Sequence, residues 1–299
     1  MNNFFGLTTD ESGVLTSTRD NVWVFNATAI STTIGWQTWT KPSGVSMVYM
    51  IAIGGGGGGG GGQSDSQSGA RSGGGGGGGS AVTVVIYPAA FLPDVLQILV
   101  GVGGAGGAAY GHGESGKMTY VSISKNIIAN DVLLASGFSA ANGGEDSSSG
   151  EGGWVDTFTS LFGNAISAGW KSIAGMRGSI GVQLGLPITS GGSVGGLVDA
   201  SHVGFDGGWV EFRTAVYTNL ILGGVAAGAG GLINGGAGVC YWQRLMFSGG
   251  SGGGANALSG TGGIGGAGGP GSGGGGGGAG VTGGTGGTGG GGLVIIAAW

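Results

Sequence analysis

Charge is scarce in this chain of 299 residues. Lys, Arg, Asp and Glu together make up only 8% of it, whereas they form about a quarter of an ordinary globular domain. The formal net charge is −5 and the sequence pI is about 4.8. Proteins that bind nucleic acid gain affinity by placing basic groups on phosphates. We therefore expect no nucleic-acid partner.

Residue types that build disulfide, metal or triple-helical scaffolds are also rare. The single cysteine, Cys240, excludes an internal disulfide, and neither His112 nor His202 lies at a short ligand spacing from another ligand. Five prolines are too few for collagen. The N-terminal sequence MNNFFGLTTDES lacks a basic segment followed by an apolar one, so we expect no secretory signal. We expect no metal ion and no cofactor.

Apolar residues, in contrast, are plentiful enough for a folded core. Hydrophobic residues make up 40% of the chain and eight of them are Trp, whereas disordered chains are poor in apolar residues and rich in charge. The uncharged stretch Thr214–Gln243 is dominated by Gly and Ala, which favours a buried segment over a membrane span. Short runs rich in Val and Ile predict strands at Val22–Phe25, Val45–Ile53, Ala81–Tyr87, Val95–Val102, Met118–Ser124, Val132–Ser136 and Leu293–Ala298. Several of these are continuously apolar, so both of their faces should be covered.

Glycine supplies 84 residues and is arranged in long tracts, the first of which is Gly54–Gly62. Near the C-terminus the tracts carry a period of three, with Thr282, Thr285 and Thr288 separated by Gly pairs. A period of three matches the polyproline-II type of helix, which has no internal hydrogen bonds. Ordering 84 glycines costs on the order of 100 kcal/mol, which side-chain burial in a few strands cannot offset. We therefore expect a mainly β fold whose strands frame a bundle of cross-bonded glycine helices.

The composition changes between Gly153 and Ser248, where aromatic residues become frequent. Apolar residues from Trp154 to Ile173 fall at helical spacing and predict one short amphipathic helix, and a strand-like Trp209–Tyr217 follows. We divide the chain into an attachment or capping segment (1–35), a first glycine-rich part (36–152), an inserted aromatic-rich module (153–248) and a second glycine-rich part (249–299). The insert reads either as a second small core or as an exposed recognition module.

Segments that resemble phosphate-binding or calcium-binding motifs lack the neighbouring residues or elements that such sites need. Gly111–Lys117 has the spacing of a phosphate-binding loop, but Met118 stands where Ser or Thr should hold magnesium, and a strand rather than a helix follows. Glu145, Asp146 and Glu151 cluster in a Ser/Gly loop without the spacing of a calcium site, which favours a solvated turn. We therefore expect that the protein is not an enzyme.

Four segments carry a resemblance to a known family. They are Trp36–Val45 with the strand and polyglycine that follow it, Pro88–Gly107, Val132–Gly144 and the C-terminal Gly-Gly-Gly-Gly-Leu-Val-Ile-Ile. Together they resemble the glycine-rich domain of bacteriophage tail fibres, adhesins and minor tail proteins. The resemblance implies a virion protein, made in the host cytoplasm, whose polyglycine-II helices stack into a rigid sandwich that displays loops to a host surface receptor. The stretch 153–248 has no counterpart in that pattern.

The expected function is therefore host-surface recognition at a tail fibre or spike, with other virion proteins, and a host receptor, as partners. Because the chain has few charges and glycine runs leave backbone exposed along their edges, we expect a homo-oligomer. A trimer would suit a fibre. The residues expected to contact the receptor are Trp154, Trp170, Trp209, Trp242, Glu145 and Asp146. Two alternatives are a structural decoration or assembly protein without receptor binding, and an ice-binding protein of the kind that uses the same helices; a depolymerase is more remote.

Overall fold

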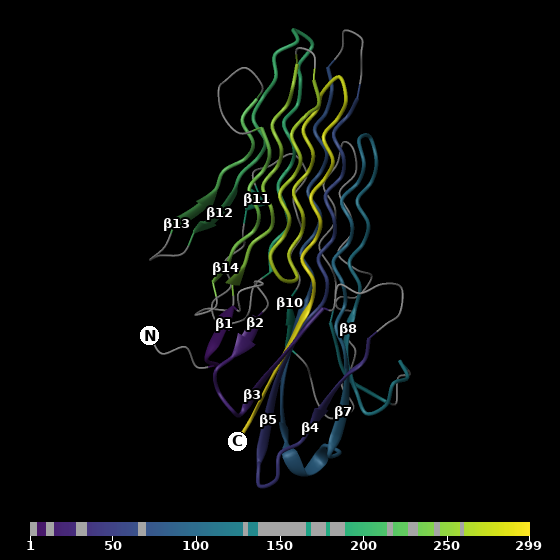
Figure 1. Ribbon diagram of the computed structural model, residues 1–299, viewed down its shortest axis with the longest axis vertical. Coiled ribbons are helices and arrows are strands. Elements are labelled where there is room, and N and C mark those ends of the chain that lie inside the picture. Colours follow the sequence, from purple (N-terminus) through teal and green to yellow (C-terminus); the bar gives the residue numbers. More distant parts are fainter. Residues whose placement is uncertain are drawn as a thin grey trace.

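The computed structural model describes residues 5–9, 15–27, 35–64, 70–127, 131–136, 166–168, 178–179, 189–213, 218–226, 233–241, 246–257 and 260–299. The described residues are mainly β, with no α-helix among them and one short 3-10 turn, η1 (Ala89–Phe91). None of their helices has the length and hydropathy needed to cross a membrane. The elongated molecule has strands at one end and long, wavy glycine runs at the other (Figure 1).

Two antiparallel sheets face each other at the strand end, which we call the sandwich. The first has the order β10-β6-β5-β16-β3, and the second has the order β4-β7-β8-β9. The strands of the first are β3 (Val22–Asn26), β5 (Met47–Ile53), β6 (Val82–Pro88), β10 (Ile166–Ala168) and β16 (Leu293–Ala298). Those of the second are β4 (Gln37–Thr40), β7 (Val95–Leu99), β8 (Thr119–Ser122) and β9 (Val132–Ser136).

The main core lies between these sheets. Trp39, Leu96 and Ile98 from the second sheet meet Met50 and Ile296 from the first, and all of them are almost fully buried. A second apolar cluster covers the other face of β5 and β16, where the hairpin of β1 (Leu7–Thr9) and β2 (Leu15–Ser17) contributes the buried Leu7. The central strands are thus covered on both faces, as their unbroken apolar sequences predict.

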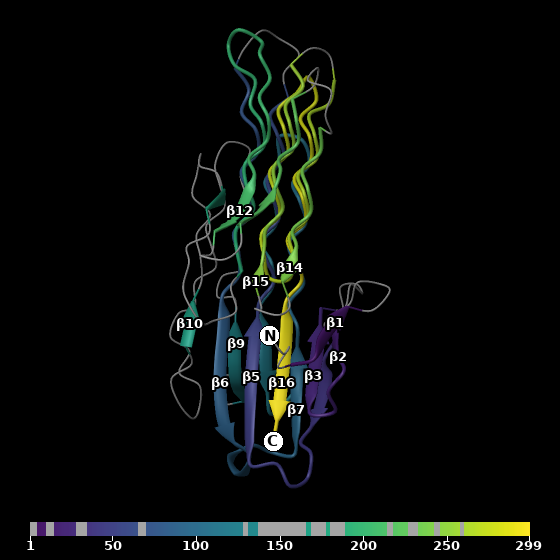
Figure 2. The ribbon, with the colours of Figure 1, turned by 90° about the vertical axis from the view of Figure 1, so that its left-hand side faces the viewer.

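Smaller sheets lie along the glycine-rich end. One joins β11 (Gly178–Ser179), β12 (Val210–Arg213) and β13 (Thr218–Ile221), and another joins β14 (Cys240–Tyr241) to β15 (Met246–Phe247). In these sheets only the β11–β12 pairing is parallel. Figure 2 shows β12 and β14 beside the glycine runs, above the sandwich.

The amphipathic helix predicted from Trp154 to Ile173 is wrong at Ile166–Ala168. These residues form β10, which pairs with the outer edge of β6 and places Ser167 opposite Thr83. Helix propensity there is weak, because Gly163 and Gly169 flank the segment, and an available sheet edge offers backbone hydrogen bonds instead. The other residues of the predicted helix lie outside the described residues.

The strands of the sandwich continue directly into glycine runs whose hydrogen bonds repeat every three residues. In run 54–62 the N–H groups of Gly55, Gly58 and Gly61 donate to run 111–117, at 2.8–2.9 Å. Those of Gly56, Gly59 and Gly62 donate to a second run, 284–290, and those of Gly57 and Gly60 donate to a third, 75–78. A β-strand bonds only to neighbours on two sides within one plane, so this pattern is not that of a sheet.

Run 271–280 is the centre of this arrangement. All ten of its residues are buried. Its N–H groups donate to runs 57–63, 190–196 and 263–266, and its carbonyls accept from runs 74–80, 250–256 and 284–290. The run thus has hydrogen-bonded neighbours on six sides, and these come from all three sequence parts 36–152, 153–248 and 249–299. We call this set of runs the bundle.

Buried hydroxyls join the sandwich to the bundle. The Thr119 hydroxyl donates to the carbonyl of Ile53 at 2.7 Å and accepts the N–H of Gly101 at 3.0 Å. Ser136 donates in the same way to the carbonyl of Ala81 at 2.6 Å, and Thr189 donates to that of Ser80. The side chains therefore bond backbone groups at the points where strands with two neighbours become runs with more neighbours.

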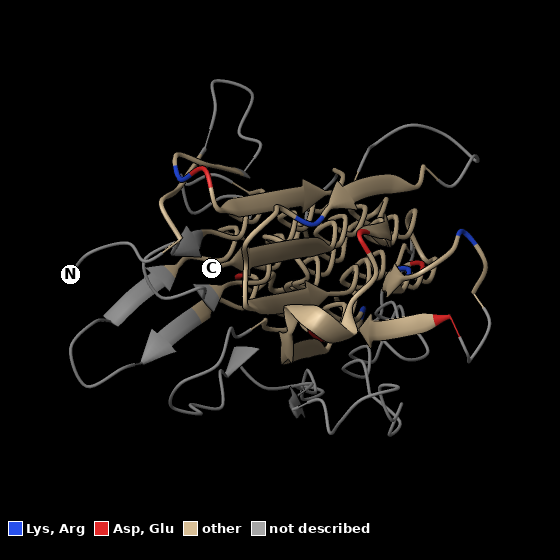
Figure 3. Cartoon of the chain, turned by 90° about the horizontal axis from the view of Figure 1, so that it is seen from below, with Lys and Arg blue, Asp and Glu red and all other residues tan. Residues whose placement is uncertain are grey.

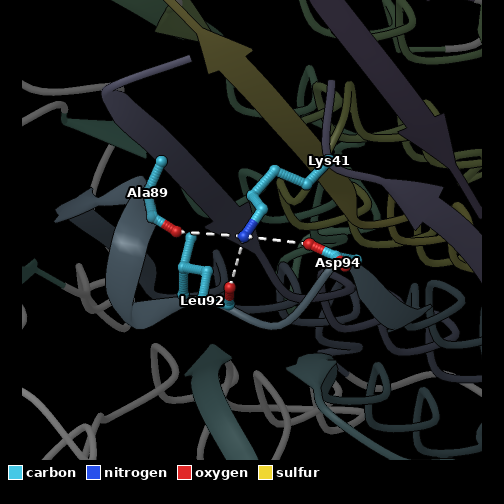
Figure 4. A network of polar contacts seen from close by, with 4 residues as sticks. All are labelled: Lys41, Ala89, Leu92 and Asp94. Carbon is cyan, nitrogen blue, oxygen red and sulfur yellow. Dashed lines mark hydrogen bonds and ion pairs between the residues drawn. The ribbon is translucent and has the colours of Figure 1, made fainter. Parts of the chain in front are cut away.

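A lysine clamps the opposite end of the sandwich. The Lys41 ammonium donates to the carbonyls of Leu92 at 2.6 Å and Ala89 at 3.2 Å, and it lies 3.2 Å from a carboxylate oxygen of Asp94 (Figure 4). These bonds tie the end of β4 to η1 and the turn into β7. Seen from this end, the few charged residues are scattered over a largely uncharged chain (Figure 3).

Replacing this lysine tests the clamp. We expect Lys41→Met to lower the free energy of unfolding by about 2 kcal/mol, because two carbonyls lose a charged donor. Asp94→Asn should cost less than about 1 kcal/mol, because the Asp94 side chain is 87% exposed and an exposed ion pair contributes little. Urea unfolding of both variants measures the difference. Equal losses would mean that the ion pair, and not the carbonyl bonds, holds the turn.

Candidate functional site

The end of the bundle away from the sandwich, which we call the tip, is built from hairpin turns between glycine runs. Three turns among the described residues are those at 109–111, 199–203 and 280–282, and they reverse runs that leave the sandwich and return towards it. The C-terminus lies at the sandwich end (Figures 1 and 2). The tip is therefore the part of the molecule that a rigid body of bonded runs holds farthest from the sandwich.

Large side chains are most exposed on two of these hairpins. Tyr110 is 60% exposed at the first turn, and Leu197, Val203 and Phe205 are 47–51% exposed around the second. Other large apolar side chains are exposed along the bundle, such as Leu222 at 66% and Ile264 at 49%, but those at the two turns project from the far end of the bonded runs. Aromatic and large apolar side chains that project from a rigid scaffold are typical of protein contact sites.

The backbone at both turns is strained. Among the described residues, the only non-glycine residues with positive φ are Tyr110, at 61°, and His202, at 62°. Glycine adopts this left-handed conformation freely, whereas for a bulky side chain it is unfavourable. A chain so rich in glycine nevertheless has Tyr and His at these turns. Strained positions of this kind gather at binding sites, which points to the tip.

The second turn is also ordered by its own side chain. One carboxylate oxygen of Asp199 accepts the N–H groups of Ser201 and Val203, both at 2.9 Å, and the carbonyl of Asp199 accepts the N–H of His202 at 3.0 Å. The neighbouring Asp206 accepts the N–H of Ala226 at 2.7 Å. The exposed Val203 is thus presented by a turn of fixed geometry.

Of the contact residues predicted from sequence, the described part of the chain includes only Trp209. Trp209 is half-buried and lies directly before β12, where its run has left the tip. Trp154, Trp170, Trp242, Glu145 and Asp146 lie outside the described residues. The tip residues gave no motif in the sequence. Their signal was faint, namely a large residue, Tyr110, where a glycine run turns.

The segment with the spacing of a phosphate-binding loop is extended backbone and does not open a helix. Gly111–Lys117 forms a run whose N–H groups at Glu114 and Lys117 bond to the adjoining run at 2.8 Å, and strand β8 follows it.

Burial raises the pKa of Tyr49 and of Tyr120, and both residues belong to sandwich strands. Within the described part of the chain, no three His, Cys, Asp or Glu side chains gather as a metal site would require.

The bundle, its strand frame and its exposed turns can be compared with known families. The family model of the glycine-rich domain matches residues 30–299. The chain belongs to the glycine-rich domain family. The match of this glycine-rich domain includes the runs at 189–257 that surround run 271–280. A search of curated proteins found no relative of the chain.

Proposed function

We propose that the runs of this glycine-rich domain are polyglycine-II helices. The support is the three-residue repeat of their hydrogen bonds and the six bonded neighbours of run 271–280. In a helix of three residues per turn, successive N–H groups point in directions about 120° apart, so each third residue meets the same neighbour. A bundle of such helices is stiff, because each run is cross-bonded on several sides.

We propose further that the protein is a non-enzymatic bacteriophage virion protein of a tail fibre or spike, and that its tip binds a host surface receptor. The phage assignment rests on the resemblance of Trp36–Val45 and the strand-to-polyglycine segments to tail-fibre glycine-rich domains. The observation that carries the tip assignment is the pair of strained, exposed turns at Tyr110 and His202.

Binding at the tip would gain from rigidity. Each turn closes two cross-bonded runs, and Asp199 holds the second turn from within. Little conformational freedom remains to be lost when a receptor binds, so more of the contact energy appears as affinity. Tyr110 and Phe205 supply aromatic surface for apolar or stacking contacts.

A single substitution separates function from folding at this site. Tyr110→Gly relieves a positive φ and removes the exposed ring, so we expect stability to rise by up to about 1 kcal/mol. If the ring contacts the receptor, the same variant should compete for adsorption of the phage to host cells at least 10-fold less well than the wild-type protein. The measurement is inhibition of adsorption by purified protein, with thermal unfolding run in parallel.

Exposed residues of the sandwich provide the control. Thr40→Gly lies at an exposed position of β4, far from the tip, and should compete as well as the wild type. If the wild-type protein blocks adsorption and Tyr110→Gly blocks it equally, the contact lies elsewhere, and the predicted Trp residues become the next to test. If the wild-type protein does not block at all, decoration or assembly of the virion becomes the working function.

A further inference from the structure

One side of the bundle carries three adjacent rows of exposed side chains, which we call the threonine face. Its middle row is Thr282, Thr285 and Thr288, and its outer rows are Val102, Ala105 and Ala108 on one side and Thr261, Ile264 and Ala267 on the other. The rows are neighbours because Gly286 donates to the carbonyl of Gly107, and Gly265 donates to that of Thr285, both at 2.9 Å. In Figure 1 run 282–292 is the yellow, wavy run that leads into the straight yellow segment ending at the C-terminus.

The runs that form this face carry no charged residues. Residues 101–110 and 260–299 contain no Lys, Arg, Asp or Glu. Run 111–117, which borders the face beyond row 102–108, carries the exposed Glu114 and Lys117. Ile264 is 49% exposed and Val102 is 41% exposed on the face itself. An uncharged surface with exposed branched side chains is unusual for a free protein surface and indicates a contact.

The hydrogen bonds also fix which residues stand at the same height. Because Gly286 bonds to Gly107 and Gly265 bonds to Thr285, Ala108, Thr285 and Ile264 lie level across the three rows. One row further along, Ala105, Thr288 and Ala267 are level in the same way, since Gly289 bonds to Gly104 and Gly268 to Thr288. The face therefore has a tall side chain, Ile264, on one side of the threonine row and a short one, Ala108, at the same height on the other.

We propose that the threonine face binds a second copy of this chain, with a two-fold axis that runs along the threonine row. Rotation about this axis exchanges the two outer rows at constant height. Ile264 of each copy then meets Ala108 of the other, and Ala267 meets Ala105. The Thr285 side chains of the two copies face each other across the axis, where their hydroxyls can hydrogen-bond.

The unequal height of the rows selects this partner over a flat crystal plane such as ice. A flat plane touches only the tallest side chains, so Ile264 would hold it away from Ala108 and the threonines. A second copy fills that step, because its Ala108 lies opposite Ile264 of the first. Shape complementarity at the centre of an interface is what distinguishes specific contacts.

The size of the face predicts a weak dimer. Rows of about nine residues at about 3.1 Å per residue are roughly 28 Å long, and runs about 5 Å apart give a width of roughly 15–20 Å. Two copies would bury on the order of 1,000 Å², at the lower limit for a specific interface, so we expect a weak, reversible association. The axis is parallel to the runs, so both tips point the same way. If the tip binds a receptor as proposed above, the dimer would bind it with two tips, but the association itself does not depend on that function.

Cross-linking of a single new cysteine tests the axis. Thr285→Cys should form a disulfide-linked dimer under mild oxidation, since the two sulfurs meet across the axis, whereas Thr40→Cys, at an exposed site of the sandwich, should not. Both variants retain Cys240, and the wild-type protein measures its background. Non-reducing electrophoresis reads the result. Equal cross-linking of the two variants, or none for Thr285→Cys, would overturn the proposed axis.

Sedimentation velocity from about 1 to 100 µM tests the packing of the outer rows. We expect the wild type to show a monomer–dimer equilibrium, Ile264→Ala to weaken it about 10-fold, and Ile264→Ala with Ala108→Ile to restore it, because the step is only exchanged between rows. A monomer over the whole range, a trimer, or a double variant as weak as the single one would each overturn the proposal. Thermal hysteresis by a monomeric wild type would assign the face to ice and overturn it as well.

Discussion

Gly276→Ala should prevent the bundle from forming, or lower the free energy of unfolding by about 3 kcal/mol or more. Gly276 lies in the buried central run, and a Cβ at this position would stand 1.8 Å from the carbonyl oxygen of Gly74 and 2.9 Å from the nitrogen of Gly195. Those two atoms belong to neighbouring runs and are bonded to each other at 2.8 Å. The methyl group cannot be accommodated by moving one flexible side chain, since every close atom is backbone.

A second glycine of the bundle provides the matched control. At Gly204 the added Cβ would meet nothing nearer than the Ala255 methyl at 3.5 Å, an ordinary contact, and the φ of Gly204 is not in the left-handed region. Gly204→Ala should therefore change stability by less than about 1 kcal/mol, and could raise it by restricting the unfolded chain. Soluble yield and urea unfolding compare the two variants. If Gly276→Ala folds with a stability near that of Gly204→Ala, the close approach of runs at the centre of the bundle is not what requires glycine.

Thr119→Val should cost about 2–5 kcal/mol, although it hardly changes the shape of the side chain. The Thr119 hydroxyl is fully buried and bonds both the carbonyl of Ile53 and the N–H of Gly101. Loss of both bonds leaves buried backbone groups at the junction of sandwich and bundle, and each such group costs about 1–3 kcal/mol. Thermal and urea unfolding would measure the loss.

Serine at the same position isolates the hydroxyl. Thr119→Ser keeps both bonds and removes one methyl group, so it should cost only about 1 kcal/mol. Hydrogen exchange at Gly101 adds a local readout, because its amide should become exposed to exchange in Thr119→Val and stay protected in Thr119→Ser. Similar stability and exchange in the two variants would show that the hydroxyl does not hold the junction.

Most sandwich strands could be predicted from local sequence. Val132–Ser136 and Leu293–Ala298 are strands with the predicted bounds, and Val45–Ile53 is two residues shorter at its start. Runs of Val and Ile flanked by glycine indicate strands because both periodicity and propensity agree there. The sequence pattern does not predict β4, since Gln37-Thr-Trp-Thr buries only Trp39 deeply and Gln37 is half-buried.

The amphipathic helix shows where local pattern fails. The spacing of apolar residues from Trp154 to Ile173 fits a helix, yet Ile166–Ala168 pairs with β6. Which of the two forms depends on whether a sheet edge lies within reach, and that edge is supplied by residues about 80 positions earlier in the chain. The candidate contact site could not be predicted for a similar reason. Tyr110 and Phe205 are far apart in the sequence and come to lie at the same end of the molecule only when the runs are aligned.

Composition and local spacing are enough to specify a chain that is mainly β, poor in charge and built on glycine repeats of three. Which run bonds to which, where the turns gather and which rows of side chains remain exposed depend on contacts between distant segments. Glycine carries no side chain that could distinguish one run from another, so the pairing of the runs is set from outside them, by strands in register and by buried hydroxyls such as that of Thr119.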